Sequence, residues 1–308
     1  MNYDIDIKKV RVNCFRQSKV PGEFMLQMSI TGGTINAKYL SDIEYIAVTW
    51  GNGTFHMGVR QTFNIPGIKY ENIDAVNEYI KDYIKEVEID ECNCDMTINY
   101  KGYPTIGARN IMACIGNTHC IKANVNTKEL STKVENLIFP SHYHIKVSVS
   151  GCPNDCGKAH FQDFGIIGQA RMEYHKERCI GCGACVRACE HHATRVLSLN
   201  ENGLVDKDPC CCVGCGECVL ACPASAWTRL PEKFYRPEYL HGGHLIDRAG
   251  YNKFKEIILD GVELNKEALV AENIYWSETE YRSNINVKPI GMHKSISTTR
   301  PIRNSENY

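Results

Sequence analysis

The sequence lacks long apolar segments, a strong excess of charge and an export signal. No run of about eighteen apolar residues occurs along the 308 residues, so we expect no transmembrane helix. The formal net charge of −1 gives no general attraction to nucleic acid or to an anionic membrane. The opening residues, MNYDIDIKKVRVNCF, contain no apolar stretch of the kind that signal peptides have. A cytoplasmic protein that binds neither nucleic acid nor membrane is therefore expected.

A dinucleotide-binding fingerprint is absent as well. No G-x-G-x-x-G motif follows an expected strand with an acidic residue downstream. We therefore do not expect the chain to oxidise NADH by itself.

Cysteine, in contrast, is abundant, with seventeen residues in the chain. Cytosolic thiols stay reduced, so ordered cysteine spacings indicate metal or cluster ligation rather than disulfides. Five cysteines fit no such spacing and are interpreted as ordinary thiols. They are Cys14, Cys92, Cys94, Cys210 and Cys211.

Two groups of cysteines repeat the spacing C-x2-C-x2-C-x3-C, which is the run found in bacterial ferredoxins. In ferredoxins with two clusters, the fourth cysteine of each run ligates the other cluster. Glycines between the cysteines let backbone N–H groups approach the cluster sulfurs. The first predicted [4Fe–4S] cluster has the ligands Cys179, Cys182, Cys185 and Cys222, and the second has Cys189, Cys212, Cys215 and Cys218.

Hydrophobic patterns predict an α+β fold that begins with a ferredoxin-like unit. Strands are expected at 24–30, 43–50 and 55–65, and a helix at 71–88. A fourth expected strand, at 137–150, is the strongest in the chain.

From His142 onward this fourth strand alternates, so that one face carries His142, His144, Lys146, Ser148 and Ser150. The face is either a solvated surface or a row of cationic donors aimed at the cysteines that follow. We favour the second interpretation. Near the C-terminus a helix is expected at about 252–272, followed by a polar tail interpreted as a loose terminus.

The four remaining cysteines give C-x5-C at Cys114 and Cys120 and C-x3-C at Cys152 and Cys156. This pattern resembles the sirohaem–[4Fe–4S] signature of sulfite and nitrite reductases. Further segments resemble the same superfamily: GVRQTFNIPGI (58–68), RNIMAC (109–114), VSGCPNDC (149–156), FQDFGIIG (161–168) and YLHGG (239–243). A reductase core interrupted by a two-cluster ferredoxin resembles the family of anaerobic sulfite reductase C subunits over roughly residues 20–250.

The resemblance implies four parts of the chain. Residues 1–100 would form a ferredoxin-like half-domain, and residues 101–172 the first part of a sirohaem and [4Fe–4S] domain. Residues 173–231 would be an inserted 2[4Fe–4S] ferredoxin, and residues 232–308 the return of the reductase domain with a tail.

The resemblance also implies the cofactors, which are sirohaem and three [4Fe–4S] clusters. Cys114, Cys120, Cys152 and Cys156 would hold the cluster coupled to sirohaem, with Cys156 bridging to the sirohaem iron. Turns at Thr31, Gly32 and Gly33, together with Asn110 and His142, would lie at the macrocycle. The glycines would bring backbone N–H groups to it, or they are simply tight turns.

Four basic residues are implied as catalytic because sulfite is an oxyanion whose oxygens leave as water. They are Arg60, Arg109, His144 and Lys146. The family pattern has a lysine at the position of His144, so this residue departs from it, and His142 is an alternative for the contact. Pairing with the carboxylates of sirohaem is the alternative role for any of these cations.

The implied function is the catalytic subunit of an anaerobic sulfite reductase that reduces sulfite to sulfide with six electrons. Its implied partners are an iron–sulfur relay subunit and a flavin- and nicotinamide-binding subunit, which would supply the link to NADH. Three alternatives remain open: a sirohaem nitrite reductase, an electron-transfer protein without catalytic sirohaem, and a non-catalytic binding subunit.

Overall fold

The computed structural model describes residues 15–87, 110–138, 146–159, 162, 164–191, 195–208, 212–230, 234–239, 257–258 and 260–261. The chain divides into two compact units. The first unit comprises Met1–Ile115, Thr127–Ser148 and Gly243–Val262. The second comprises Gly116–Asn126, Val149–Gly242 and Glu263–Tyr308.

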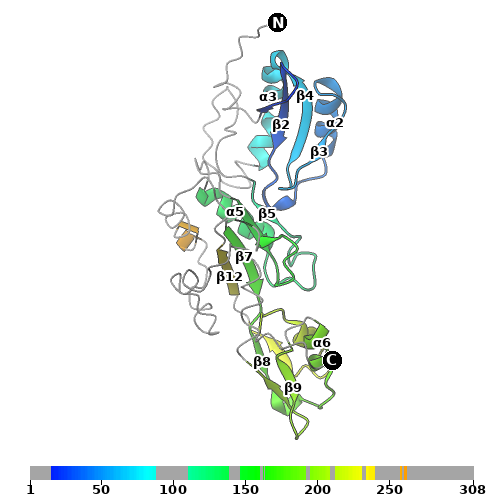
Figure 1. The fold of residues 1–308 in the computed structure, drawn as a ribbon, viewed down its shortest axis with the longest axis vertical. Coiled ribbons are helices and arrows are strands. Elements are labelled where there is room, and N and C mark those ends of the chain that lie inside the picture. Colours follow the sequence, from blue (N-terminus) through cyan, green and yellow to red (C-terminus); the bar gives the residue numbers. More distant parts are fainter. Residues whose placement is uncertain are drawn as a thin grey trace, which may run out of the picture. The chain divides into compact units, whose positions relative to one another are not determined.

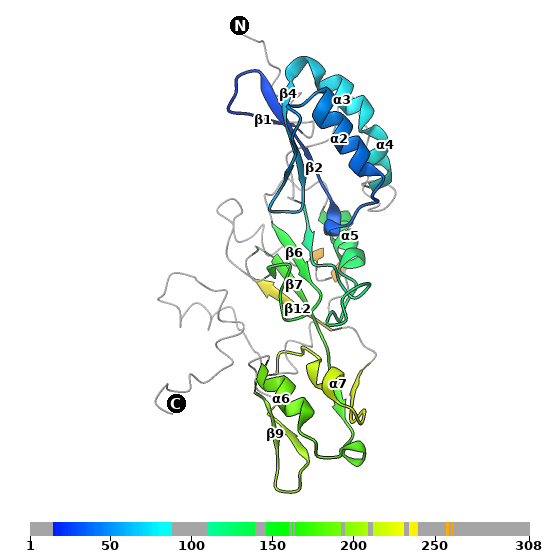
Figure 2. The same ribbon diagram turned by 90° about the vertical axis from the view of Figure 1, so that its right-hand side faces the viewer.

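The first unit contains an antiparallel four-stranded sheet with the order β1-β2-β4-β3 (Figure 1). Its helices α2, α3 and α4 lie together on one side of the sheet in Figure 2. The strands are β1 (Phe15–Gln17), β2 (Glu23–Met28), β3 (His56–Met57) and β4 (Phe63–Lys69). The helices are α2 (Tyr39–Thr49), α3 (Ile73–Tyr79) and α4 (Lys81–Ile84), with short 3-10 turns η1 (Thr31–Gly33) and η2 (Tyr70–Asn72).

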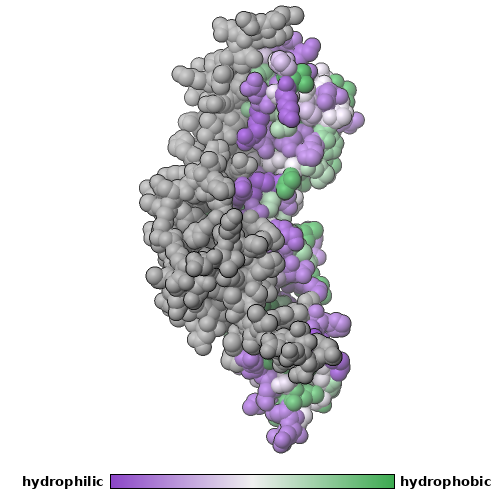
Figure 3. Space-filling model, viewed as in Figure 1, coloured by the Kyte–Doolittle hydropathy of each residue, from purple (hydrophilic) through white to green (hydrophobic). Residues whose placement is uncertain are grey.

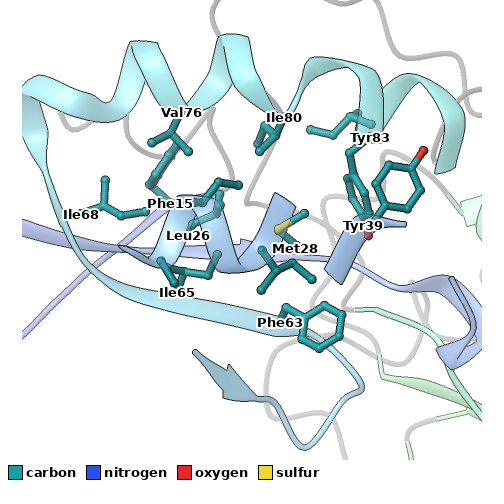
Figure 4. Packing of buried hydrophobic residues seen from close by; sticks show 14 of the residues in the cluster. Phe15, Leu26, Met28, Tyr39, Phe63, Ile65, Ile68, Val76, Ile80 and Tyr83 are labelled. Carbon is teal, nitrogen blue, oxygen red and sulfur yellow. The ribbon is translucent and has the colours of Figure 1, made fainter. Parts of the chain in front are cut away.

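The core of the first unit forms where these helices cover the sheet. Figure 4 shows Val76 and Ile80 on the helical side facing Leu26 and Ile65 on the strands. All four side chains are buried. Each such side chain contributes about 1.5–3 kcal/mol relative to its exposed state, so this unit has a substantial apolar core of its own.

The expected strand at 43–50 is wrong, because this segment lies in helix α2. The buried residues of α2 are Tyr39, Ile43, Ile46 and Ala47, which recur every three or four positions as on one helical face. The expected strand at 55–65 is divided into β3 and the start of β4 by a turn in which Gly58 N–H donates to the Thr62 carbonyl at 2.6 Å. The expected strand at 24–30 is confirmed as far as Met28, where β2 ends. The expected helix at 71–88 is confirmed over α3 and α4, which are separated at Ile80, while its start is the 3-10 turn η2.

The first unit also contains β5 (Met112–Ala113) and α5 (Thr127–Ile138), and β5 neighbours β6 (Val147–Ser150) in sheet order. The expected strand at 137–150 is wrong at its start, since Leu137 and Ile138 end α5. It is confirmed over β6, whose four residues are all buried, so Ser148 and Ser150 are not on a solvated face. His142 and His144 lie outside the described residues.

The second unit includes the end of β6, together with β7 (Phe164–Gln169) and β12 (Phe234–Tyr239), in the order β12-β7-β6. Between β7 and β12 the chain forms what we call the cysteine module, residues 172–229. Strands β8 (Met172–Tyr174) and β11 (Trp227–Arg229) pair antiparallel at its base, and β9 (Leu197–Leu199) pairs with β10 (Val205–Lys207). The module also contains η5 (Lys176–Arg178), α6 (Ala184–His191) and α7 (Glu217–Ala221), and α6 packs against α7 (Figure 2).

The two ends of the cysteine module meet. Leu230 N–H donates to the Arg171 carbonyl at 3.0 Å, directly beyond the β8–β11 pair. An insertion whose ends meet can interrupt a strand-to-strand connection without separating β7 from β12. The boundaries of the expected insert at 173–231, and of the other three expected parts, stay predictions.

Outside these elements few features are described. Of the helix expected at 252–272, only residues 257–258 and 260–261 are described, and these are helical. Within the described part of the chain, no helix has the length and apolar character needed to cross a bilayer. The visible described surface mixes hydrophilic residues with smaller hydrophobic areas (Figure 3).

Candidate functional site

A cavity in the cysteine module is lined by four cysteines, Cys189, Cys212, Cys215 and Cys218. These are the four ligands predicted for the second ferredoxin-type cluster, including Cys189 from the other run. Hydrophobic side chains such as Leu197 and Trp227 complete the lining together with the charged residues Lys207 and Glu217. Four thiols around one small cavity fit a [4Fe–4S] cluster, which takes one cysteine per iron.

The two cysteine runs share one backbone conformation. Gly181 and Gly214 have φ of 68° and 68°, and Gly183 and Gly216 have φ of 67° and 77°. These left-handed values favour glycine and turn the chain between successive cysteines. A helix begins directly before the third cysteine of each run, since α6 contains Cys185 and α7 contains Cys218, and this repetition fits two equivalent cluster sites.

The last cysteine of each run accepts a backbone hydrogen bond in the same manner. Val196 N–H donates to Cys189 Sγ at 3.3 Å, and Ala226 N–H donates to Cys222 Sγ at 3.2 Å. The residues just before these donors, Arg195 and Ser225, have left-handed φ of 48° and 50°. Such N–H···S contacts stabilise negative charge on a cluster ligand and help to set its potential.

The first predicted cluster set lies in the same apolar cluster of side chains. Cys185 is buried there, and Cys179 and Cys222 pack against it, while Cys182 is exposed. Burial raises the pKa of the Cys218 thiol to about 12 and also raises the pKa values of Cys185 and Cys215. These thiols therefore stay protonated at neutral pH unless a metal displaces the protons.

Among the described residues, no group of three or more His, Cys, Asp and Glu side chains is arranged to hold a single metal ion. The cavity with four cysteines suits a multinuclear cluster instead, because each cysteine then binds a different iron.

The loop that carries Cys152 and Cys156 is held by a buried network. Ser150 Oγ donates to Asp155 Oδ1 at 2.6 Å and accepts from Gly157 N–H at 3.1 Å. Asp155 has a left-handed φ of 52°, and its carboxylate also accepts from Ala159 N–H at 2.6 Å. Cys156 itself is exposed, and Asn154 Nδ2 donates to its sulfur at 3.4 Å. The network fixes the loop while the Cys156 thiol stays accessible, and its role as a shared ligand stays a prediction.

Strand β7 lies tightly against this loop. A Cβ added at Gly168 would come within 2.6 Å of the carbonyl oxygen of Gly151, the residue before Cys152. Asn124 N–H donates to the same carbonyl at 2.7 Å. Glycine at position 168 therefore lets the backbone approach the cysteine loop closely.

In the first unit, Gln61 and Asn110 hold the segment that leads to Cys114. Gln61 Nε2 donates to the Ala113 carbonyl at 2.7 Å, and its Oε1 accepts from Ala113 N–H at 2.8 Å. Asn110 is buried, and its amide contacts backbone groups of Ile30 and Arg60. Thr127 Oγ1 donates to the carbonyl of Cys114 at 2.5 Å.

Arg60 lies beside the same segment. Its Nη2 donates to the carbonyls of Asn110 at 2.5 Å and Val147 at 3.1 Å, so it joins the RNIMAC segment to the start of β6. Lys146 is half-buried and directly precedes Val147 in the chain. The structure thus brings Arg60, Asn110 and β6 together, whereas Arg109, His142 and His144 lie outside the described residues.

In the turn at Thr31–Gly33, two backbone N–H groups donate hydrogen bonds within the protein, whereas one buried side-chain hydroxyl has no partner among the described residues. Gly32 N–H donates to Ile111 at 3.1 Å and Gly33 N–H to Ile30 at 2.9 Å. Thr31 Oγ1 is buried and has no hydrogen-bond partner in the described part of the chain. A buried hydroxyl of this kind fits a polar group of a bound cofactor better than the two N–H groups do. Contact of this turn with sirohaem stays a prediction.

An ion pair that the sequence does not reveal joins the residues after Cys120 to helix α7. Lys122 Nζ lies 2.9 Å from Glu217 Oε1. The hydrogen bond to Glu217 raises the pKa of Lys122, and electrostatic interaction with Cys152 and Cys215 acts in the same direction.

Sequence reasoning also missed Gln61, Ser150 and Asp155. Ser150 and Asp155 flank the cysteine loop and belong to residue types that often bond to nearby backbone, which was a usable signal. Gln61 carried none.

Comparison with known proteins identifies the family to which the chain belongs. The family model described as nitrite and sulphite reductase 4Fe-4S domain matches residues 106–267, and the nitrite/sulfite reductase ferredoxin-like half domain matches residues 16–83. The anaerobic sulfite reductase C subunit of Salmonella typhimurium is 44% identical over 94% of this chain and 100% of its own length. The chloroplastic ferredoxin–nitrite reductase of Spinacia oleracea is 25% identical over 54% of this chain and 26% of its own length.

Among solved structures, a dissimilatory sulfite reductase I superposes with a TM-score of 0.52 at 13% identity, covering 89% of this chain and 78% of the other. This likeness shows a shared fold. The two family models and the full-length similarity together show that the chain belongs to the family of anaerobic sulfite reductase C subunits, within the nitrite and sulfite reductases.

Proposed function

We propose that this chain is the catalytic subunit of an anaerobic sulfite reductase, which reduces sulfite to sulfide with six electrons. The observation that carries the substrate assignment is the similarity along the whole length of the anaerobic sulfite reductase C subunit of Salmonella typhimurium. The reaction balances as one sulfite dianion with six electrons and eight protons, giving one hydrogen sulfide and three waters. The proposal therefore needs a route for electrons, a binding site for an oxyanion and a source of protons.

Electrons would travel through the two ferredoxin-type clusters of the cysteine module. The cavity lined by Cys189, Cys212, Cys215 and Cys218 supports one of these clusters. The matching backbone of the other run supports the second. A third cluster would be held by Cys114, Cys120, Cys152 and Cys156, whose loops are fixed by the Ser150 and Gln61 contacts.

Sirohaem, when bound, supplies an iron for the sulfur of sulfite and accepts electrons from the neighbouring cluster. Cys156 is exposed on a loop fixed by Ser150 and Asp155, which suits its predicted role as the bridging ligand. The unpartnered hydroxyl of Thr31 suits a polar group at the macrocycle edge. Arg60 and Lys146 would place positive charge beside the oxyanion, together with Arg109 and His144.

Asn110 is proposed to hold the Arg60 side chain in place without contacting the substrate itself. Its own carbonyl accepts from Arg60, and its amide fixes the backbone at Arg60 and Ile30. Its effect on substrate would then be indirect, by positioning the guanidinium.

The first test is the content and turnover of anaerobically purified protein. We expect the optical absorbance of an isobacteriochlorin, iron for three [4Fe–4S] clusters, and sulfite-dependent oxidation of a reduced viologen. Iron and sulfide without isobacteriochlorin absorbance would instead support an electron-transfer protein. Cofactor content without turnover would support a non-catalytic subunit.

The second test concerns the cation at Lys146. Lys146→Gln should lower kcat/KM for sulfite about ten- to hundredfold, because a hydrogen bond to a charged group contributes about 1.5–3 kcal/mol. The exposed Lys85 of the first unit provides a matched control, and Lys85→Gln should leave kcat/KM unchanged. Equal effects of the two substitutions would remove Lys146 from the substrate site.

Nitrite reduction is the second candidate, because the matching family model covers both activities and nitrite reductases are among the relatives. Steady-state assays with both anions at one pH separate the two. A much higher kcat/KM for nitrite would overturn the sulfite assignment.

The remaining parts of the proposal concern the protein subunits that donate electrons to this chain. The sequence has no dinucleotide fingerprint, and the Salmonella typhimurium relative is named as one subunit of a larger enzyme. Both observations suggest that other subunits donate the electrons. We propose an iron–sulfur relay subunit and a flavin- and nicotinamide-binding subunit, which would link the reaction to NADH. A cytoplasmic location would keep the thiols reduced.

A further inference from the structure

The ion pair between Lys122 and Glu217 connects two cysteine-bearing segments of the second unit. Its Nζ–Oε1 distance is 2.9 Å, and the side chains of Lys122 and Glu217 are 42% and 14% exposed. The low exposure of Glu217 matters, because water and salt screen the attraction of a mostly covered carboxylate less than that of a solvated one. The pair therefore joins a partly exposed ammonium to a mostly covered carboxylate.

Each end of this pair lies on a segment that carries ligands of a different predicted cluster. Lys122 follows Cys120 by two residues, and its ammonium interacts electrostatically with Cys152 as well as with Cys215, which is near Glu217 in the chain. Glu217 lies between Cys215 and Cys218 and lines the cavity that these cysteines enclose. One ion pair therefore spans from the ligands of the sirohaem-coupled cluster to the ligands of one ferredoxin-type cluster.

Backbone contacts connect the same two regions. Ala170 N–H, at the end of β7, donates to the Gly214 carbonyl at 2.7 Å, and Gln169 Nε2 donates to the Val213 carbonyl at 3.0 Å. The same strand lies against the Cys152 loop at Gly168. Strand β7 thus contacts both the second cysteine run and the reductase cysteine loop.

The first cysteine run has a different neighbour. A Cβ added at Gly181 would meet the carbonyl of Gly203 at 3.0 Å, in the turn between β9 and β10. Cys182 in this run is exposed. This run is therefore placed at the β9–β10 side of the module, with a solvent-accessible ligand.

From this placement we propose an order for the electron relay, which rests on the proposed function. The cluster of Cys179, Cys182, Cys185 and Cys222 receives electrons from the donor. The cluster of Cys189, Cys212, Cys215 and Cys218 passes them to the cluster that includes Cys120, Cys152 and Cys156. Lys122 and Glu217 are positioning residues that fix the spacing and the charge between these last two clusters.

Each step of this relay moves one electron and no proton. The ferredoxin-type cluster is oxidised by one electron, and the cluster at Cys152 is reduced by one electron. Six such transfers, supplied by a one-electron donor, complete one sulfite reduction. The positive charge of Lys122 favours the reduced form of both clusters, since reduction adds a negative charge to each, and it offsets the carboxylate of Glu217.

The test uses the full-length holoprotein and measures the reduction potentials of the clusters by EPR-monitored titration. Lys122→Gln should shift the ratio of reduced to oxidised cluster about tenfold toward the oxidised form, which is about 59 mV for one electron. The charge swap K122E/E217K should recover part of this shift because the pair is restored. Lys133→Gln is the control, since Lys133 forms an exposed 3.0 Å ion pair with Glu129 on α5, and should shift nothing. Equal potentials in Lys122→Gln and the native protein would overturn the role of the pair.

A second measurement tests the order of the clusters. Neighbouring paramagnetic clusters broaden each other's EPR signals, so the signal of the Cys152 cluster reports which ferredoxin-type cluster is adjacent. Cys215→Ser should remove this broadening, and Cys182→Ser should retain it. The reverse result overturns the order. If a cysteine variant does not fold, Glu217→Gln keeps all ligands and should still alter the potential of the cluster next to it, and no change would contradict the proposal.

These readouts separate the inference from the proposed function. A protein without isobacteriochlorin absorbance or sulfite turnover fails the proposed function. A protein that turns over sulfite, yet shows unchanged potentials in Lys122→Gln and broadening retained in Cys215→Ser, fails only the inference.

Discussion

At the scale of single residues, Asn110 shows how a predicted cofactor contact can have a structural role. Its Oδ1 accepts from Ile30 N–H at 3.1 Å, and its Nδ2 donates to the carbonyls of Ile30 at 3.1 Å and Arg60 at 2.6 Å. The oxygen and the nitrogen of this buried amide are therefore both used in hydrogen bonds to the protein backbone. The prediction of a direct cofactor contact is untested, but the structure supplies an alternative reason for the residue.

Asn110→Ala is expected to destabilise the first unit, because it removes the partner of the Ile30 N–H and of the carbonyls of Ile30, Arg60 and Gln61. Each unsatisfied buried group costs about 1–3 kcal/mol. Chemical denaturation of the native and variant proteins measures this loss. Asn202→Ala, at an exposed turn of the cysteine module, is the control. Unchanged stability together with a loss of bound sirohaem would favour the cofactor contact instead.

Ser150 is expected to support the Cys152–Cys156 loop specifically. Ser150→Ala removes one donor to Asp155 and one acceptor from Gly157, which should loosen the loop by about 1–3 kcal/mol. We expect loss of iron from the sirohaem-coupled cluster while the two ferredoxin-type clusters remain. Iron quantitation with EPR of each cluster checks this.

The exposed Ser198 of β9 provides a matched control for Ser150, and Ser198→Ala should retain all iron. Full retention of the coupled cluster in Ser150→Ala would show that the loop does not depend on this network.

At the scale of elements, β7 positions the reductase cysteine loop through Gly168. Gly168→Ala would place a Cβ 2.6 Å from the Gly151 carbonyl, which is closer than real Cβ contacts, so the strand or the loop must move. Overpacking of this kind typically costs about 1–3 kcal/mol. We expect a lower melting temperature and weaker retention of the Cys152 cluster.

Gly203→Ala is the control for steric contact, because a Cβ added at Gly203 meets no atom within 4 Å. Its φ of 71° still makes alanine strained, so Gly203→Ala reports backbone strain without overpacking. Equal loss of the Cys152 cluster in both variants would argue against a specific role for Gly168.

The elements also show where sequence reasoning succeeds and fails. The grouping of Cys189 with the second cysteine run was predictable because the geometry of a cluster restricts thiolate spacing, and the cavity does include Cys189, while its ligand role stays a prediction. Helix α2 was mistaken for a strand because IEYIAVTW satisfies both periods over a short window, and only packing against the sheet decides between them. The partners of Gln61 and Lys122 could not be predicted, because they lie 52 and 95 positions away in sequence and depend on the completed fold.

At the scale of the whole molecule, the first unit and the cysteine module differ in the side chains that form their cores. The first has a core of large apolar side chains such as Phe15, Leu26 and Ile65. In the cysteine module, four of the eight buried core residues are cysteines: Cys185, Cys189, Cys212 and Cys218. A domain of about 60 residues is marginal even with a full apolar core. The module should therefore depend on its clusters for stability.

Removal of iron is accordingly expected to unfold the cysteine module and leave the sheet of the first unit folded. Without iron, burial holds the pKa of Cys218 at about 12, so the core would contain protonated thiols around an empty volume instead of ligated sulfur. Hydrogen-exchange mass spectrometry on chelated and native protein measures this for each segment. Peptides covering α6 and α7 should lose protection, and those covering β2 and β4 should keep it. Equal protection of α6 and α7 with and without iron would mean that Trp227 and its neighbours suffice to stabilise the module.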